Sequence, residues 1–174
     1  IYLLSVLGII YASLSAIRQT DLKRIIAYSS VAHINLVTLG IFSFNIIGLE
    51  GSILQSISHG FVSGAMFLLV GVLYDRYHSR LLYYYGGLVH MMPLYSIFLL
   101  FFTMANIALP GTSSFVGEFL LLTGIYKTNV LSCIVGALGV VLCGAYSLWL
   151  YNRIIFGNLK VVFVTKFKDI NHRE

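Results

Sequence analysis

Charged residues are scarce in this sequence: Asp, Glu, Lys and Arg make up 10% of the 174 residues, whereas 59% are hydrophobic. Soluble domains carry about 25% charged residues, so the composition excludes an ordinary soluble globular protein. The hydrophobic residues occur in long runs, several of them close to the ~20 residues that a helix needs to cross a bilayer. The sequence therefore predicts an integral membrane protein with the lipid bilayer as its surroundings.

Cysteine is also rare, and the two cysteines, Cys133 and Cys143, lie in no C-x-x-C motif or Cys/His cluster. The sequence contains no Gly-rich phosphate loop, dinucleotide fingerprint or nucleophile motif. We therefore expect no metal site, no bound cofactor and no catalytic residue in this chain, and we interpret both thiols as small buried hydrophobic groups. The net charge is +5, but the basic residues separate apolar runs instead of forming a basic face with interleaved aromatics, which argues against a nucleic-acid partner.

Five transmembrane spans are predicted, at about residues 1–18, 22–48, 52–74, 93–126 and 129–153, within a transmembrane repeat that covers residues 1–156. The fourth would run about 51 Å as one straight helix, well past a hydrocarbon core of ~30 Å. One of only two prolines, Pro110, stands in its middle with Gly111, which predicts an interruption at Leu109–Ser114. The hydroxyl residues that follow could cap a new helix. Residues 157–174 are too polar for a span and are expected to form a loop or tail.

The distribution of charge favours one crossing by the interrupted segment. With a single crossing, every one of the 11 Lys and Arg residues except Lys127 falls on the same side of the membrane. Two crossings would divide them and remove most of the positive-inside bias. We therefore expect five spans, with the basic side facing the cytoplasm or the mitochondrial matrix.

Three ionisable residues are predicted near the middle of the membrane. Counting 1.5 Å per helical residue places Glu118, His33 and His59 about 12–15 Å from a membrane surface. An unpaired charge at that depth costs a few kcal/mol or more, so these groups should be paired, hydrated or titrating, and they are candidates for a proton pathway. The alternatives are that Glu118 only stabilises the start of a half-helix and that the histidines are hydrogen-bonded packing residues. The distance from Ser114 to Glu118 does not fit a capping box.

A polar stripe accompanies one of the histidines. Ser52, Ser56, His59 and Ser63 are spaced four, three and four residues apart, which places them on one helix face. We expect this face to point into the bundle and to support water beside the imidazole. Lys23, at the start of the second span, either extends to the headgroups or has a functional role.

Five segments resemble the chain 4 family of mitochondrial NADH–ubiquinone oxidoreductase, respiratory complex I, whose members are antiporter-like subunits of the membrane arm. The segments are Gln19–His33, Ser58–Gly60, Tyr74–Arg80, Leu109–Phe119 and Tyr146–Arg153. The resemblance implies two inverted five-helix repeats, of which this chain supplies the second. It also implies that Glu118 is the acid at the end of a hydrated central axis, that His33 and His59 lie along that axis, and that Lys23 is a motif lysine at a helix start.

The same resemblance implies a function. The chain would be a proton-translocating subunit in the mitochondrial inner membrane, with its basic loops toward the matrix. Its partners would be other membrane-arm subunits, including the segment that carries the first repeat. NADH oxidation and ubiquinone reduction, with their flavin, iron–sulfur clusters and quinone, would take place in other subunits. The alternatives are a subunit of a multisubunit monovalent cation/proton antiporter and a purely structural membrane-arm segment.

Overall fold

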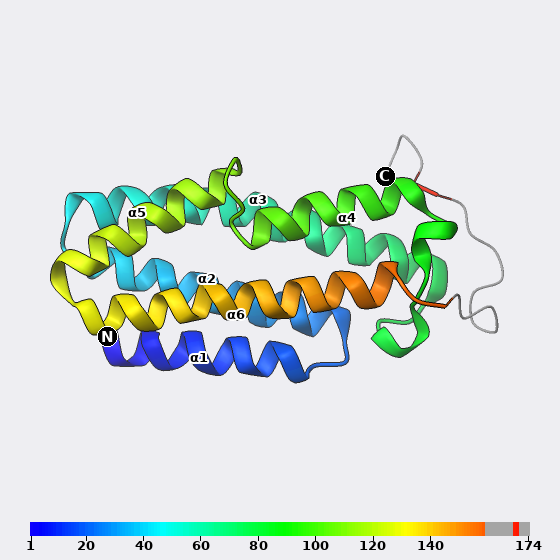
Figure 1. Ribbon diagram of the computed structural model, residues 1–174, viewed down its shortest axis with the longest axis horizontal. Helices are drawn as coiled ribbons and strands as arrows, with labels where there is room; N and C mark the ends of the chain where they lie inside the picture. The colour runs from blue at the N-terminus through cyan, green and yellow to red at the C-terminus, as the bar shows by residue number, and fades with distance from the viewer. Residues whose placement is uncertain (159–168, 171–174) are drawn as a thin grey trace.

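The computed structural model describes residues 1–158 and 169–170, and that part of the chain is α-helical with two short 3-10 turns. Its helices are α1 (Tyr2–Arg18), α2 (Leu22–Ile41), α3 (Ile46–Tyr77), α4 (Pro93–Asn106), α5 (Ser113–Thr128) and α6 (Val130–Ile155). The helices lie side by side along one axis, and α4 and α5 follow one another along the length of α3 (Figure 1). The chain thus runs along the bundle five times, which confirms the expected five-span architecture with one interrupted helix.

The composition of the helices suits a lipid environment. Within the described residues, α2, α3 and α6 are each long and apolar enough to cross a membrane, with mean hydropathies of 1.2, 1.7 and 2.1 over their most apolar segments. The helices α1 and α4 are apolar but shorter. Large side chains such as Phe61, which is 75% exposed, cover the outer surface of the bundle. Such a surface requires lipid or another apolar partner around it.

Basic residues gather at one end of the bundle. The C-terminal ends of α1, α3 and α6 meet the N-terminal ends of α2 and α4 there (Figure 1). Two backbone hydrogen bonds, from Leu22 N to Arg80 O and from Leu82 N to Thr20 O, both 2.9 Å, join the α1–α2 loop to the α3–α4 loop. Lys127 lies in the last turn of α5, at the opposite end. Most of the expected polar tail at 157–174 falls outside the described residues.

The boundary between the second and third spans differs from the prediction. The second helix was expected to reach residue 48 and the third to begin at 52, but α2 ends at Ile41 and α3 begins at Ile46. Phe44 adopts a left-handed backbone with φ 53°, which no helix tolerates. The Ser43 hydroxyl donates to the carbonyl of Gly40 over 2.7 Å and so stabilises the end of α2. The turn between the helices contains two phenylalanines and no glycine or proline. The sequence therefore stays apolar through the turn, and hydropathy alone does not reveal where α2 ends.

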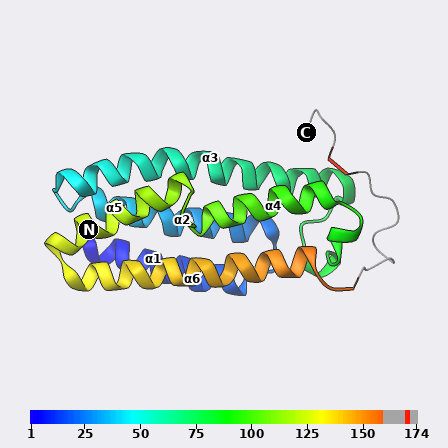
Figure 2. The same cartoon turned by 45° about the horizontal axis from the view of Figure 1, so that its top comes forward.

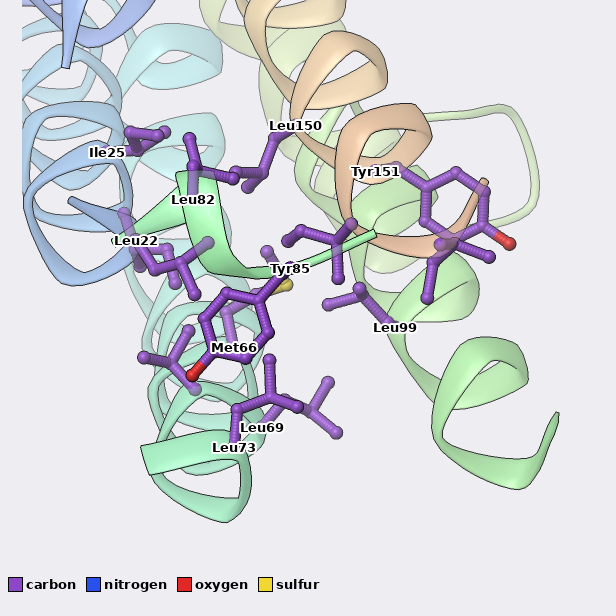
Figure 3. Close-up of a cluster of buried hydrophobic side chains, with 14 of the residues drawn as sticks. Leu22, Ile25, Met66, Leu69, Leu73, Leu82, Tyr85, Leu99, Leu150 and Tyr151 are labelled. Atoms are coloured by element: carbon purple, nitrogen blue, oxygen red, sulfur yellow. The ribbon is translucent and has the colours of Figure 1, made fainter. Parts of the chain in front are cut away.

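Among the described residues, the basic end contains the larger of two apolar clusters. Side chains from α2, α3, α4 and α6 meet around Tyr85, which comes from the loop between α3 and α4 (Figure 3). The Tyr85 hydroxyl donates to Ser79 O over 2.6 Å, and burial raises the pKa of this phenol to about 12.

Asp169 caps the start of α4 at the same end of the bundle. Its carboxylate accepts hydrogen bonds from the amides of Leu94 (2.9 Å) and Tyr95 (3.2 Å) in the first turn of that helix.

Candidate proton pathway at the helix break

The interruption between α4 and α5 contains the two residues that predicted it. Pro110 has no N–H, and Gly111 has a φ of 105°, a conformation that other L-residues rarely adopt. Ala108 also has a positive φ, of 60°. After Figure 1 is turned by 45°, the interrupted helix lies between α3 and α6 (Figure 2). Both halves therefore border the interior of the bundle.

The hydroxyl residues at the break do not cap the second half-helix as expected. Thr112 is the N-cap residue of α5, but its side chain donates to Leu109 O over 2.8 Å. Ser114 donates back to the carbonyl of Ala105, and Ser113 pairs with Ser58 of α3 over 2.9 Å. At the break these carbonyls accept from nearer amides than in an α-helix, Ala105 O from Ala108 N (3.1 Å) and Leu109 O from Thr112 N (3.0 Å). Each carbonyl has a second lone pair that accepts a hydroxyl, and the Ser113–Ser58 contact attaches the break to α3.

Glu118 lies on the inner face of α5, beside a close contact with α3. It is 4% exposed. A Cβ atom on its neighbour Gly117 would lie 2.6 Å from Gln55 Oε1, so the absence of a side chain at 117 makes room for the Gln55 amide. Gln55 Nε2 donates to Glu118 Oε1 over 3.1 Å. The carboxylate is thus buried but hydrogen-bonded, as its cost in a membrane requires.

The structure brings the two predicted histidines to this acid. His33 Nδ1, on α2, lies 3.1 Å from Glu118 Oε1. The rings of His33 and His59 have centroids 4.9 Å apart at an interplanar angle of 37°. His59 Nε2 is buried and has no hydrogen-bond partner among the described residues. Three residues far apart in the sequence therefore form one cluster, although the role predicted for them remains a prediction.

Other residues of the cluster were missed at the sequence level. Cys143 Sγ lies 3.4 Å from His33 Nε2, and the Tyr146 hydroxyl donates to this sulfur over 3.1 Å. Cys143 is buried as expected, but it is a polar partner and not only a hydrophobic group. Gln55 could have been suspected, because an amide in an apolar helix, four residues before His59, lies on the same face. The sequence offers no comparable signal for Cys143.

The remaining predicted residues lie apart from the cluster. Ser52 is buried and donates to Leu49 O over 2.7 Å, whereas Ser56 is exposed and donates to Ser52 O over 2.7 Å. Ser63 is half-buried, so the expected inward stripe is only partly realised. The inward face of α3 instead contains Gly48, Gly51, Gln55 and Ser58, because this face contacts α5. Lys23 is exposed in the first turn of α2.

The arrangement suits the movement of protons. An ionised Glu118 only accepts hydrogen bonds, so His33 Nδ1 donates to it and His33 Nε2 is left as an acceptor when the ring is neutral. One proton taken up by Glu118 or His33 can pass between them along a single hydrogen bond. Within the described residues, no group of three or more His, Cys, Asp or Glu side chains could hold a metal ion.

Comparison with known proteins agrees with this description. The fold and the cluster define a membrane bundle that holds ionisable groups beside a broken helix. Residues 1–143 match the family described as NADH:quinone oxidoreductase/Mrp antiporter, transmembrane, and the chain belongs to this family.

Individual relatives are similar over the whole chain. It is 62% identical to NADH-ubiquinone oxidoreductase chain 4 of Marchantia polymorpha and of Arabidopsis thaliana, and 52% identical to NADH-quinone oxidoreductase subunit M of Rhodobacter capsulatus. In each comparison all of this chain is aligned, but it spans only about a third of the relative: 35% of the first two and 34% of the third.

Solved structures give the same fold. A chain of respiratory complex I from Thermus thermophilus with bound NADH superposes with a TM-score of 0.86 and 31% identity, over 90% of this chain and 33% of that one. A chain of the Mrp complex from Dietzia superposes with a TM-score of 0.85 and 24% identity, over 90% of this chain and 30% of that one. The second comparison establishes a shared fold only.

Proposed function

We propose that this chain is the second five-helix repeat of a proton-translocating membrane-arm subunit of respiratory complex I. The observation that carries the proposal is the buried contact of Glu118 with His33 and Gln55 at the helix break, next to His59. The relatives named as chain 4 of NADH-ubiquinone oxidoreductase support the choice of complex. In this proposal, protons pass between Glu118 and His59 through the His33 ring, in which one nitrogen gains a proton as the other releases one.

The transfer between the histidines needs a further element. Their centroids are 4.9 Å apart, and His59 Nε2 is a buried ring nitrogen with no hydrogen-bond partner among the described residues. A buried polar atom of this kind is commonly satisfied by water. We therefore propose that water beside His59 continues the pathway, with the first repeat enclosing it.

The other subunits of the complex complete the activity. We propose that NADH oxidation and ubiquinone reduction, with their flavin, iron–sulfur clusters and quinone, take place outside this chain. Their free energy would reach Glu118 as a change of conformation or electrostatic field. The partners are the segment with the first repeat and the adjacent membrane-arm subunits, in the mitochondrial inner membrane.

The acid is tested by replacing Glu118 with Gln in the assembled complex. Gln keeps the shape and much of the hydrogen bonding but cannot ionise, so we expect normal assembly and a fall of at least about tenfold in proton pumping and quinone reduction together. Glu118→Asp should retain part of both rates. Glu50→Gln is the matched control, because Glu50 is an exposed acid on α3. A Gln variant that assembles normally and pumps protons at the wild-type rate would refute the proposal.

The orientation is proposed from the basic end, which would face the matrix. His78 and Lys127 are both exposed, and they lie at the ends of α3 and α5 on opposite ends of the bundle. We expect an impermeant thiol reagent to label a His78→Cys variant only from the matrix side and a Lys127→Cys variant only from the other side. Labelling of both from one side would contradict the topology.

An antiporter subunit is the alternative that the fold also permits, given the similarity to a chain of the Mrp complex. Copurification distinguishes the two functions. The complex I proposal expects the full-length subunit to copurify with NADH-oxidising activity, whereas an antiporter subunit would copurify with sodium/proton exchange and no NADH oxidation.

A further inference from the structure

Cys143 lies at a junction that the proposed pathway does not use. Its sulfur is 3.4 Å from His33 Nε2 on α2 and 3.5 Å from the backbone carbonyl of Asn106, the last residue of α4. A thiol has a single hydrogen, so it can donate to only one of these two acceptors at a time. The two distances are nearly equal, and neither acceptor is excluded by geometry.

The Asn106 carbonyl needs a donor because of the helix break. In a continuous helix this carbonyl would accept from the N–H of residue 110, but residue 110 is Pro110, which has none. The thiol takes the place of that missing N–H. An unsatisfied carbonyl in an apolar interior is costly, so the Cys143 hydrogen has a favourable position here even when it leaves His33.

The sulfur itself is held in place by other donors. The Tyr146 hydroxyl donates to it over 3.1 Å, and Asn106 Nδ2 lies 3.7 Å away. Tyr146 lies one turn further along α6 and is 2% exposed. These contacts fix the sulfur position but leave the direction of its S–H bond free to change.

We propose that Cys143 is a positioning residue of the proton pathway, whose S–H donates to His33 Nε2 while His33 is neutral and turns to the Asn106 carbonyl when Nε2 gains a proton. No covalent bond changes at sulfur: the protonated Nε2 becomes the donor and Sγ its acceptor. The proton that Nε2 gains comes from the His59 side of the pathway, because Nδ1 already carries the hydrogen that it donates to Glu118, so this inference rests on the proposed function. Its consequence is that the charge of His33 determines whether the end of α4 has a hydrogen-bond donor.

The test uses the complete complex in inner-membrane vesicles. Cys143→Ala removes both hydrogen-bonding functions, Cys143→Ser keeps a donor and an acceptor, and Cys133→Ala is the matched control. Cys133 is on the same helix, but its thiol donates to Leu122 O over 3.4 Å, away from the cluster. We expect Cys143→Ala to lower proton pumping about fivefold, the effect of one hydrogen bond. Cys143→Ser should recover most of the loss, and Cys133→Ala should behave as wild type.

An infrared difference spectrum on addition of NADH supplies a readout that packing alone would not change. We expect a shift of an S–H stretching band that is present in wild type and in Cys133→Ala, absent in Cys143→Ser, and unchanging in a His33→Gln variant, whose side chain cannot titrate. Loss of the band in Cys143→Ser assigns it to the Cys143 thiol, even if Cys143→Ala fails to assemble.

Two results would overturn the role of Cys143: pumping in Cys143→Ala equal to that in Cys133→Ala, or an S–H spectrum that NADH does not alter. If either occurs while Glu118→Gln still lowers the pumping rate at least about tenfold, the thiol role fails and the proposed function stands. If Glu118→Gln pumps normally, the proposed function itself has failed.

Discussion

The two halves of the interrupted helix are held by different kinds of contact. On α5, backbone approaches backbone: a Cβ at Gly51 of α3 would lie 2.7 Å from Leu121 N, and a Cβ at Gly124 would lie 2.6 Å from Gly48 N. On α4, large side chains such as Tyr95 and Leu99 fill the apolar cluster at the basic end. The half that carries Glu118 is therefore fixed by contacts that cannot adjust, whereas the other half rests on side chains that can repack.

This difference explains how a charged group can be kept in a defined position inside an apolar bundle. A hydrogen bond to a buried carboxylate depends on a few tenths of an ångström. The close approach of α3 and α5 sets the distance from Gln55 to Glu118 through the backbones of both helices. The position of the carboxylate is thus set by the backbone packing of α3 and α5.

The largest expected effect comes from Gly51→Val. The added side chain would meet backbone atoms of α5, so the helices must separate, at a cost of about 3 kcal/mol. We expect little assembled complex on a native gel and a corresponding loss of quinone reductase activity. Gly64→Val is the control on the same helix, because a Cβ at Gly64 meets nothing within 4 Å. Equal assembly of both variants would show that α5 is not fixed through α3.

A smaller effect is expected from Leu99→Ala on α4. Leu99 is 1% exposed, so its truncation leaves a cavity that costs about 2 kcal/mol. We expect a lower melting temperature of the complex but a pumping rate per assembled complex within about twofold of wild type, since Glu118 and its partners are untouched. A stable Leu99→Ala complex that does not pump would mean that α4 controls the acid as directly as α5 does.

Much of the fold followed from the sequence because its signals are local. Apolar length identified the spans, and Pro110 with Gly111 identified the break. The fixed rise of a helix predicts one membrane depth for Glu118, His33 and His59, and the structure places these residues together.

Which residues face the interior of the bundle depends on how each helix is rotated about its own axis. That rotation is set by packing against the other helices and cannot be derived from the sequence of one helix. The stripe through Ser56 and Ser63 has the correct period, but close packing of Gly48 and Gly51 against α5 turns a different face of α3 inward. Gln55 enters the cluster for the same reason. Cys143 became a partner of His33 only through the packing of α6 beside α2, a contact between residues 110 positions apart in the sequence.

The cap that Asp169 places on α4 has a consequence for the order of synthesis. The amide of Leu94 obtains its carboxylate partner from a residue 75 positions later. At about 5–20 residues per second, a ribosome takes roughly 4–15 s to cover that distance. During this interval α5 and α6 can enter the membrane while the first turn of α4 still lacks its cap. The start of the interrupted helix is therefore among the last parts of this bundle to be completed, after the helix that carries Glu118 has already been made.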